Sequence, residues 1–257
     1  DPSHRKKAAR LNREWEAEID RYTTHGNLPL PSQGEVVGEV NAAAGPEDVV
    51  VSAAGSLPND LQKLWRSEDP KSYHVEYGFS CMGYEIAGGL GVKLAAPERE
   101  VFVMVGDGSY LMMPSEIVTA AQEGVKLIIV LVQNHGFASV GALSRRHGTE
   151  GFGAEYRRRG ADGLLSGDLL PVDLAANAAS LGAKAIRVER VAELREALKE
   201  ARAATETTVI HVETDPQVNV PRFFWWDVAV AEVSDSEAVQ AARDDYEKER
   251  AKARRHL

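Results

Sequence analysis

The sequence is poor in cysteine and in long hydrophobic runs. Its one cysteine, Cys81, excludes an internal disulfide and a cysteine zinc cluster, and it fits a reducing, cytoplasmic setting. The longest apolar run lies near residues 125–132, where Lys126 interrupts it. A membrane span needs about 18 consecutive apolar residues. We therefore expect no transmembrane helix and no membrane partner.

Two common phosphate-binding fingerprints are also missing. Gly106-x-Gly108 and Gly89-x-Gly91 both lack the third glycine of G-x-G-x-x-G, and no G-x-x-x-x-G-K-[ST] occurs. These absences argue against a nicotinamide or P-loop nucleotide site.

The composition is that of a globular protein. Hydrophobic residues make up 44% and charged residues 27%, which excludes a disordered or collagen-like chain. The net charge of −9 argues against a nucleic acid partner. The 257 residues predict one large domain or two small ones. The chain starts at Asp1 without an apolar signal core, so this start resembles the inside of a longer chain or an artificial boundary.

Buried strands alternate with helices along most of the chain. Continuous β-branched runs predict strands buried on both faces at 48–52, 100–105, 126–132, 183–188 and 208–212. Helical stretches are predicted between them, at 59–65, 83–94, 114–122, 172–181 and 191–203. This alternation predicts an α/β fold, a doubly wound parallel sheet with helices on both faces. Outside it, helices are expected at 4–22 (anchored by Leu11, Trp15 and Ile19), at about 34–43 and at about 235–256.

Ligands of such a sheet bind outside the carboxyl ends of its strands. Three small, polar, glycine-containing segments follow predicted strands, at 53–60, 106–113 and 133–139. In the second, Gly106-Asp107-Gly108-Ser109 predicts a tight turn whose amides, before a helix at Pro114, suit an anionic group. The alternative is an Asp-Gly turn that binds nothing.

Asn134 favours the ligand-binding interpretation. It directly follows another buried strand, and 25 residues separate it from Gly108, which is the length of one helix and one strand. Asp107 and Asn134 should therefore sit on neighbouring strand ends. With the backbone carbonyl of Gly136, they supply half of an oxygen shell for Mg²⁺, which takes its other ligands from diphosphate and water. Asn is otherwise a routine turn residue at such a place.

These segments resemble a known enzyme family. The Gly-Asp-Gly-Ser motif followed by Asn134 is similar to the thiamine diphosphate motif, and the stretch upstream looks like the diphosphate-binding domain of acetohydroxyacid synthase and pyruvate oxidase. The strings AAGSLPNDLQKLW, YHVEYGFSCMGYEIAGGLGVKLA, GDGSYLMM and NHGFASVGALSR resemble the thiamine-dependent trihydroxycyclohexane-1,2-dione hydrolases of myo-inositol catabolism. The resemblance implies a thiamine diphosphate-binding domain over residues 31–233, after an N-terminal helix and linker (1–30) and before a C-terminal helix (234–257).

The resemblance also implies roles for single residues. Asp107, Asn134 and the carbonyl of Gly136 would hold Mg²⁺. Met82 would prop the bent cofactor beside the backbone of Cys81, although a core methionine is the alternative. The residues implied to hold the diphosphate or to line its site are Gly55, Ser56, Gly106, Gly108 and Ser109.

One part of the family pattern is missing. The glutamate that activates the cofactor lies in a separate pyrimidine-binding domain, and no segment of this sequence resembles that domain. The resemblance therefore implies, as partner, such a domain in the same longer chain or in a partner subunit, within a homodimer or homotetramer. Glu76 and Glu116 are the acids nearest to the motifs, and both fit packing, capping or substrate contact better.

The implied reaction is hydrolytic carbon–carbon cleavage of the small-molecule cyclic dione to 5-deoxyglucuronate. His135 and His74 flank the cofactor motifs and are the candidate proton shuttles; Glu76 and Tyr77 are weaker candidates. The alternatives are a carboligase or decarboxylase that uses the same cofactor, and a non-catalytic fragment that only binds it. Trp225 and Trp226 are expected to anchor the C-terminal tail rather than to close over the site.

Overall fold

The computed structural model describes residues 2–221 and 225–253. Contacts divide the chain into two units, one of Asp1–Asn134 with Val172–Val220 and one of His135–Pro171 with Pro221–Leu257. This division differs from the predicted domain boundaries, because the N-terminal helix joins the first unit and the insertion at 135–171 joins the C-terminal part. The boundaries at residues 30 and 233 stay a prediction.

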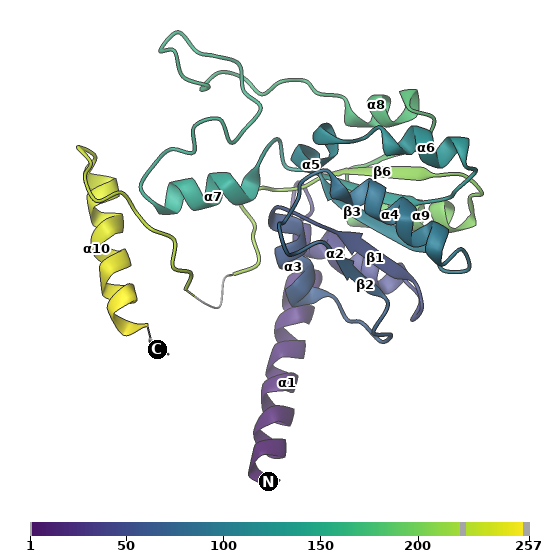
Figure 1. Cartoon of the computed structure of the whole chain (residues 1–257), viewed down its shortest axis with the longest axis horizontal. Helices are drawn as coiled ribbons and strands as arrows, with labels where there is room; N and C mark the ends of the chain where they lie inside the picture. The colour runs from purple at the N-terminus through teal and green to yellow at the C-terminus, as the bar shows by residue number, and fades with distance from the viewer. Residues whose placement is uncertain (1, 222–224, 254–257) are drawn as a thin grey trace. The chain divides into compact units, whose positions relative to one another are not determined.

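The first unit is built on a six-stranded sheet in the order β2-β1-β3-β4-β6-β5, and every neighbouring pair is parallel (Figure 1). The strands are β1 (Val49–Ser52), β2 (Tyr73–Val75), β3 (Val101–Gly106), β4 (Ile128–Gln133), β5 (Lys184–Val188) and β6 (Thr208–Glu213). The predicted α/β fold and its five strands are confirmed. The sequence did not predict β2, because its three half-buried residues at the sheet edge carry no apolar run.

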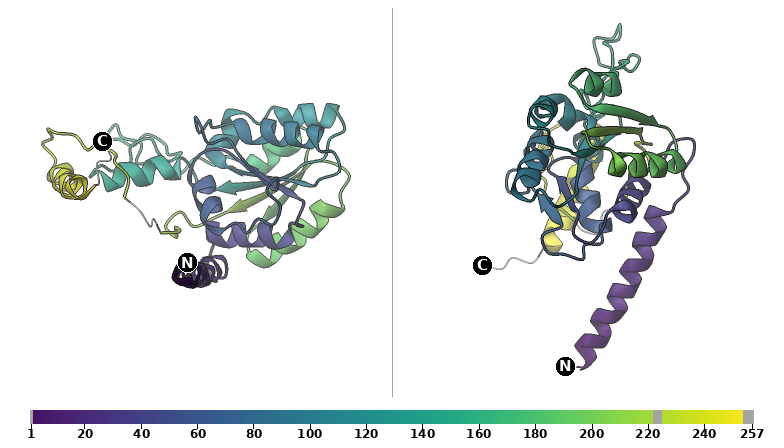
Figure 2. Two further views of the ribbon diagram at one scale, coloured as in Figure 1. Left: turned by 60° about the horizontal axis from the view of Figure 1, so that its bottom comes forward. Right: turned by 90° about the vertical axis from the view of Figure 1, so that its right-hand side faces the viewer.

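Helices cover both faces of this sheet (Figure 2). One face carries α2 (Gln33–Ala43), α3 (Ser56–Leu64) and α9 (Val191–Ala203). The other carries α4 (Tyr84–Ala95), α5 (Asp107–Met112), α6 (Glu116–Gln122) and α8 (Leu174–Ser180). Successive side chains of a strand point to opposite faces of the sheet. In β3, Phe102 and Met104 pack in the core on the first face, and Val103 and Val105 pack in the core on the second.

The N-terminal helix α1 (Pro2–Thr23) leans on the first core by one face, as predicted. Ile19 is buried in that core, and Trp15 packs against it. Leu11 was predicted wrongly as an anchor, since it is 48% exposed. The next helix, α2, begins at a capping box, in which Ser32 Oγ accepts from Glu35 N (3.2 Å) and Glu35 Oε2 accepts from Ser32 N (2.8 Å).

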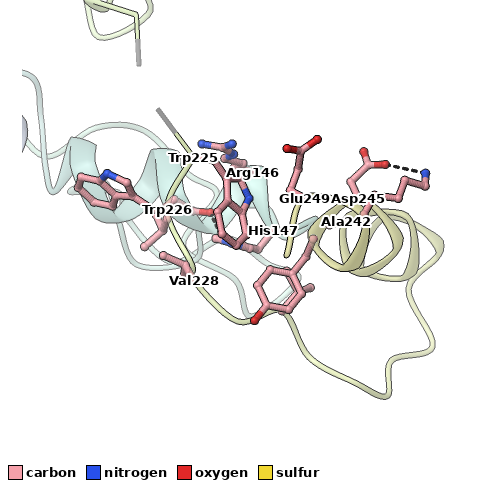
Figure 3. Close-up of a pocket in the computed structure, with 12 residues that line it drawn as sticks. Arg146, His147, Trp225, Trp226, Val228, Ala242, Asp245 and Glu249 are labelled. Carbon is pink, nitrogen blue, oxygen red and sulfur yellow. Dashed lines mark hydrogen bonds and ion pairs between the residues drawn. The ribbon is translucent and has the colours of Figure 1, made fainter. Parts of the chain in front are cut away.

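The second unit contains α7 (Ala138–Arg146) and α10 (Glu237–Lys252). Trp225 packs on Tyr246 of α10, with ring centroids 6.0 Å apart, and the Tyr246 hydroxyl donates to Asp227 (2.7 Å). Trp225 thus contacts the C-terminal helix as an anchor does, while Trp226 is 42% exposed. Both tryptophans line a cavity of about 620 Å³ within this unit (Figure 3). No residue predicted to bind cofactor or metal lines this cavity.

Among residues 2–221 and 225–253, no helix combines the length and the apolar character that crossing a bilayer requires.

Two glycines of α4 provide a paired test of how tightly this helix packs on the sheet. A Cβ on Gly89 would overlap Cγ2 of Val103 in β3, whereas a Cβ on exposed Gly91 meets no atom within 4 Å. Gly89→Ala should lower the free energy of unfolding by about 1–3 kcal/mol, the usual cost of overpacking a core. Gly91→Ala should raise it by about 0.4–1 kcal/mol, because alanine restricts the unfolded chain more than glycine does. Urea unfolding curves measure both, and equal effects of the two variants would contradict the packing described.

Candidate functional site

The sheet brings three of the predicted site residues, Gly55, Asp107 and Asn134, to one edge. From β1 the chain first adds β2 on one side and then β3 on the other, so a topological switch point lies between β1 and β3. Ligands of doubly wound sheets bind at such a point, outside the carboxyl ends of the strands. Gly55 follows β1, Asp107 follows β3, and Asn134 follows the neighbouring β4, which pairs with β3 from Phe102↔Ile128 to Gly106↔Val132.

Asp107 and Asn134 meet at this edge, as the spacing predicted. The Asp107 side chain is 1% exposed; its Oδ2 accepts from Asn134 N (3.3 Å) and its Oδ1 from Gly108 N (3.0 Å). The amide oxygen Oδ1 of Asn134 is buried and has no hydrogen-bond partner among the described residues. Leaving such an acceptor unsatisfied costs about 1–3 kcal/mol. A ligand that takes the oxygen's lone pairs would remove this cost.

These donors suit a hard cation. A carboxylate and an amide oxygen are the oxygen ligands that Mg²⁺ takes alongside phosphate and water. Within residues 2–221 and 225–253, no three His, Cys, Asp or Glu side chains cluster as a transition-metal site would require. Gly136, the third predicted ligand, lies at the start of the second unit, where it bridges Glu155. A Cβ there would lie 2.8 Å from Cα of Glu155, so the close backbone approach requires glycine.

Two of the residues predicted to hold or line the diphosphate, Gly55 and Gly106, have open space beside their backbone. Gly55 is the N-cap of α3 with φ of +96°, and a Cβ built on Gly55 or on Gly106 meets no atom within 4 Å. Backbone can therefore approach a ligand closely at both positions. One expectation was wrong: the helix after β3 begins at Asp107 as α5, rather than at Pro114, so Gly108 and Ser109 lie in its first turn.

The side chain of Ser56 is hydrogen-bonded to a series of buried polar side chains. The Ser56 hydroxyl donates to Oε1 of Gln33 (3.2 Å), and Nε2 of Gln33 donates to Oδ2 of Asp60 (2.7 Å). Lys63 Nζ lies 3.5 Å from Oδ1 of Asp60, and both side chains are buried. Burial outweighs the attraction of Lys63 and raises the pKa of Asp60 to about 6. Gln33 and Asp60 could not be predicted from the sequence, because a polar residue in a helix is normally exposed.

The turn that carries Cys81 and Met82 is held by hydrogen bonds from its own backbone. Glu76 accepts from Phe79 N (3.1 Å) and Cys81 N (2.6 Å), and these bonds lower the pKa of the Glu76 carboxyl. Glu76 therefore builds the loop. Met82 is half-buried and belongs to neither core cluster of the sheet, which argues against the core-methionine alternative.

Ser109 connects this turn to a carboxylate that the sequence analysis did not single out. Its hydroxyl oxygen accepts from Gly83 N (2.7 Å) and lies 2.8 and 2.7 Å from the two carboxylate oxygens of Glu85. Glu85 is 1% exposed and also accepts from Ala54 N (3.3 Å). Burial raises the pKa of Glu85. The only sequence signal was an acid in the first turn of a largely apolar helix, where glutamate is common because it interacts favourably with the helix dipole.

The two candidate histidines lie in different units. His74 in β2 is half-buried, its Nε2 lies 2.7 Å from the Tyr84 hydroxyl, and the two rings stack with centroids 5.8 Å apart. His135 begins the second unit with φ of +63°, a left-handed conformation that is uncommon for non-glycine residues. Its carbonyl accepts from Tyr156 N (2.9 Å). Tyr77 is 63% exposed, and Glu116 opens α6.

With this geometry established, comparison with known proteins decides the family. Residues 53–212 match the thiamine pyrophosphate enzyme family, C-terminal TPP binding domain. The chain belongs to this family. The match begins directly after β1, includes β2 to β5 and β6 through Val212, and covers the edge where Asp107 and Asn134 meet.

Individual curated relatives have more specific names than the domain family. The chain is 45% identical over 213 residues to 3D-(3,5/4)-trihydroxycyclohexane-1,2-dione hydrolase 2 of Bacillus cereus, and 43% identical over 213 residues to the hydrolase of that name from Bacillus thuringiensis. Each match covers 82% of this chain and 33% of the relative, so the chain spans about a third of the length of these relatives.

Solved structures share the fold. Benzoylformate decarboxylase from Polynucleobacter necessarius superposes with a TM-score of 0.63 at 23% identity, over 75% of this chain and 34% of that one. A thiamine diphosphate-dependent 4-hydroxybenzoylformate decarboxylase from Rhodococcus jostii gives 0.62 at 22% identity, over 72% and 33%.

Asp60 predicts a pH dependence of stability. Its pKa is about 6 in the folded protein against an ordinary 3.8, so the folded state binds more protons between about pH 4 and 6. The free energy of unfolding should therefore fall as the pH rises through this window. Asp60→Asn should abolish this fall in the free energy of unfolding. The control is Asp244→Asn, at an exposed position of α10, which should keep it. Urea unfolding at pH 4, 5, 6 and 7 measures the slope; the same slope in wild type and Asp60→Asn would refute the assignment.

Proposed function

We propose that this chain carries the diphosphate-binding part of a thiamine diphosphate- and Mg²⁺-dependent hydrolase, which opens the ring of trihydroxycyclohexane-1,2-dione to 5-deoxyglucuronate in inositol catabolism. The observation that carries the cofactor part is the pair at the strand ends. The Asp107 carboxylate accepts from Asn134 N, and the buried Oδ1 of Asn134 has no hydrogen-bond partner within residues 2–221 and 225–253. The substrate part is supported by the name of relatives 43–45% identical to the chain.

The residues present fit the cofactor. Asp107 and Asn134 would hold Mg²⁺ by side chain and Gly136 by its carbonyl, while the open backbone at Gly55 and Gly106 would admit the diphosphate. Ser56, Gly108 and Ser109 would lie around it, and Cys81 and Met82 would meet the aminopyrimidine. When bound, thiamine diphosphate supplies an electron sink for carbon–carbon cleavage.

Proton transfer is the part of the reaction that this chain's side chains would perform. His135 and His74 are the proposed shuttles, because an imidazole can both accept and donate a proton through its ring nitrogens. His74 has a defined ring orientation, since Tyr84 bonds its Nε2 and stacks on the ring. The left-handed backbone at His135 favours a functional role, because such strain persists where the surrounding structure enforces it.

A partner domain is part of the proposal. Large apolar side chains stand exposed in the Cys81 loop and after Gly108, namely Tyr77, Phe79, Leu111, Met112 and Met113. These two segments adjoin, because a Cβ on Gly83 would lie 3.1 Å from Cβ of Met113. An exposed apolar patch beside a site favours an interface. We propose that a pyrimidine-binding domain covers this apolar patch. The domain would lie in the same longer chain or in another subunit of a homodimer or homotetramer, and the assembly would be cytoplasmic.

A carboligase or decarboxylase with the same cofactor is the alternative function. The two solved structures are decarboxylases, but at 22–23% identity they support the fold alone. The chain is about twice as similar in sequence to the dione hydrolases, which favours hydrolysis.

Removing the Asp107 carboxylate tests the cofactor site. Asp107→Ala should weaken the binding of thiamine diphosphate in the presence of Mg²⁺ by orders of magnitude, because the metal loses its charged protein ligand. Asp244→Ala, which removes an exposed acid, is the matched control and should bind as wild type does. Isothermal titration calorimetry measures both. An unchanged affinity in Asp107→Ala would eliminate the metal-site proposal.

Activity of the chain by itself tests the need for a partner domain. Without the activating glutamate, the chain should turn over little or no dione, since a positioned acid or base contributes about 10²–10⁴-fold. Exchange of the thiazolium C2 proton of added cofactor, followed by NMR, should stay near the rate of free thiamine diphosphate. Adding the complementary amino-terminal part of a relative should accelerate exchange and restore ring opening. Fast exchange on the chain alone would show that an activating group lies within this sequence.

A further inference from the structure

The hydrogen and one lone pair of the Ser109 hydroxyl are engaged inside the protein. A serine hydroxyl has one hydrogen to donate and two lone pairs. Its hydrogen is directed to Glu85, whose oxygens lie 2.8 and 2.7 Å away, and one lone pair accepts from Gly83 N at 2.7 Å. No hydrogen remains for a phosphate oxygen, although the sequence pattern placed Ser109 among the residues that hold the diphosphate.

Glu85 joins three segments of the site. Its carboxylate accepts from Ala54 N in the loop after β1 and from Ser109 in α5, and it extends from the first turn of α4. The Glu85 side chain is 1% exposed in a helix whose neighbouring positions are apolar. A buried carboxylate is costly, and here its neighbours are hydrogen-bond donors that offset part of this cost.

The segment that Ser109 holds is the turn before α4. Gly83 is the N-cap of that helix with φ of +90°, and its N–H is the donor to Ser109. Met82 and Cys81 directly precede it and are partly or fully exposed. A shift of the Gly83 peptide would therefore move both residues that face the proposed cofactor.

We propose that Glu85 and Ser109 are positioning residues: Glu85 accepts the Ser109 hydrogen, and Ser109 fixes the Cys81–Gly83 turn without bonding the diphosphate through its side chain. The consequence for the cofactor rests on the proposed function. The geometry of the turn does not, and it can be measured without any cofactor.

Cys81 provides the first readout, because it is the sole cysteine and is exposed. A thiol reagent therefore reports on this turn alone. Ser109→Ala and Glu85→Leu should label several-fold faster than wild type, although leucine fills the volume of Glu85. Glu85→Gln keeps an acceptor oxygen and should label at nearly the wild-type rate. Ser56→Ala is the serine control, since Ser56 bonds Gln33 and not the turn, and its rate should be unchanged.

Binding of Mg²⁺ with inorganic diphosphate, measured by calorimetry, is the second readout. Ser109→Ala should bind within twofold of wild type, and Asp107→Ala should bind far more weakly. A large loss of diphosphate affinity in Ser109→Ala would overturn the proposal, and so would labelling rates that are equal in wild type, Ser109→Ala and Glu85→Leu. Should wild type itself fail to bind Mg²⁺ and diphosphate, the proposed function would fall, while the labelling rates would still decide the role of Glu85.

Discussion

The meeting of two strand ends is the constraint on which the site depends. β3 and β4 are parallel neighbours, so the residues that follow them, Asp107 and Asn134, leave the sheet at the same edge. The register brings a carboxylate oxygen to within 3.3 Å of the neighbouring backbone N–H and leaves a buried amide oxygen without a partner among the described residues.

Much of the fold could be predicted from the sequence, because the central strands are parallel and buried on both faces. Such strands read as continuous apolar runs, and the turns that end them mark the functional edge. The runs therefore predicted both the sheet and the adjacency of Asp107 and Asn134. The sequence did not predict the short edge strand β2 or the helices α5 and α7. β2 has only three half-buried residues, α5 begins in a glycine-rich turn and α7 has a mixed composition, so none of the three shows a strong periodicity.

The polar support of the site was harder to predict. Glu85, Gln33 and Asp60 lie on helices, where a polar residue usually faces water, and only the packing shows that all three are buried. Their partners are distant in the chain: Glu85 bonds Ser109, and Gln33 bonds both Ser56 and Asp60. The motif predicted which residues would face a ligand. The folded structure was needed to find the residues that hold them, and to show that one motif residue, Ser109, is bonded to this supporting layer.

The most direct test of the metal site at the strand ends is a crystal structure of the chain with Mn²⁺ and thiamine diphosphate, using the anomalous signal of manganese to locate the metal. We expect one strong peak with the Asp107 carboxylate and Oδ1 of Asn134 at about 2.0–2.3 Å, the distances expected for oxygen ligands of a cation of this size. A peak away from these two residues, or diphosphate bound without metal at the strand ends, would contradict this site.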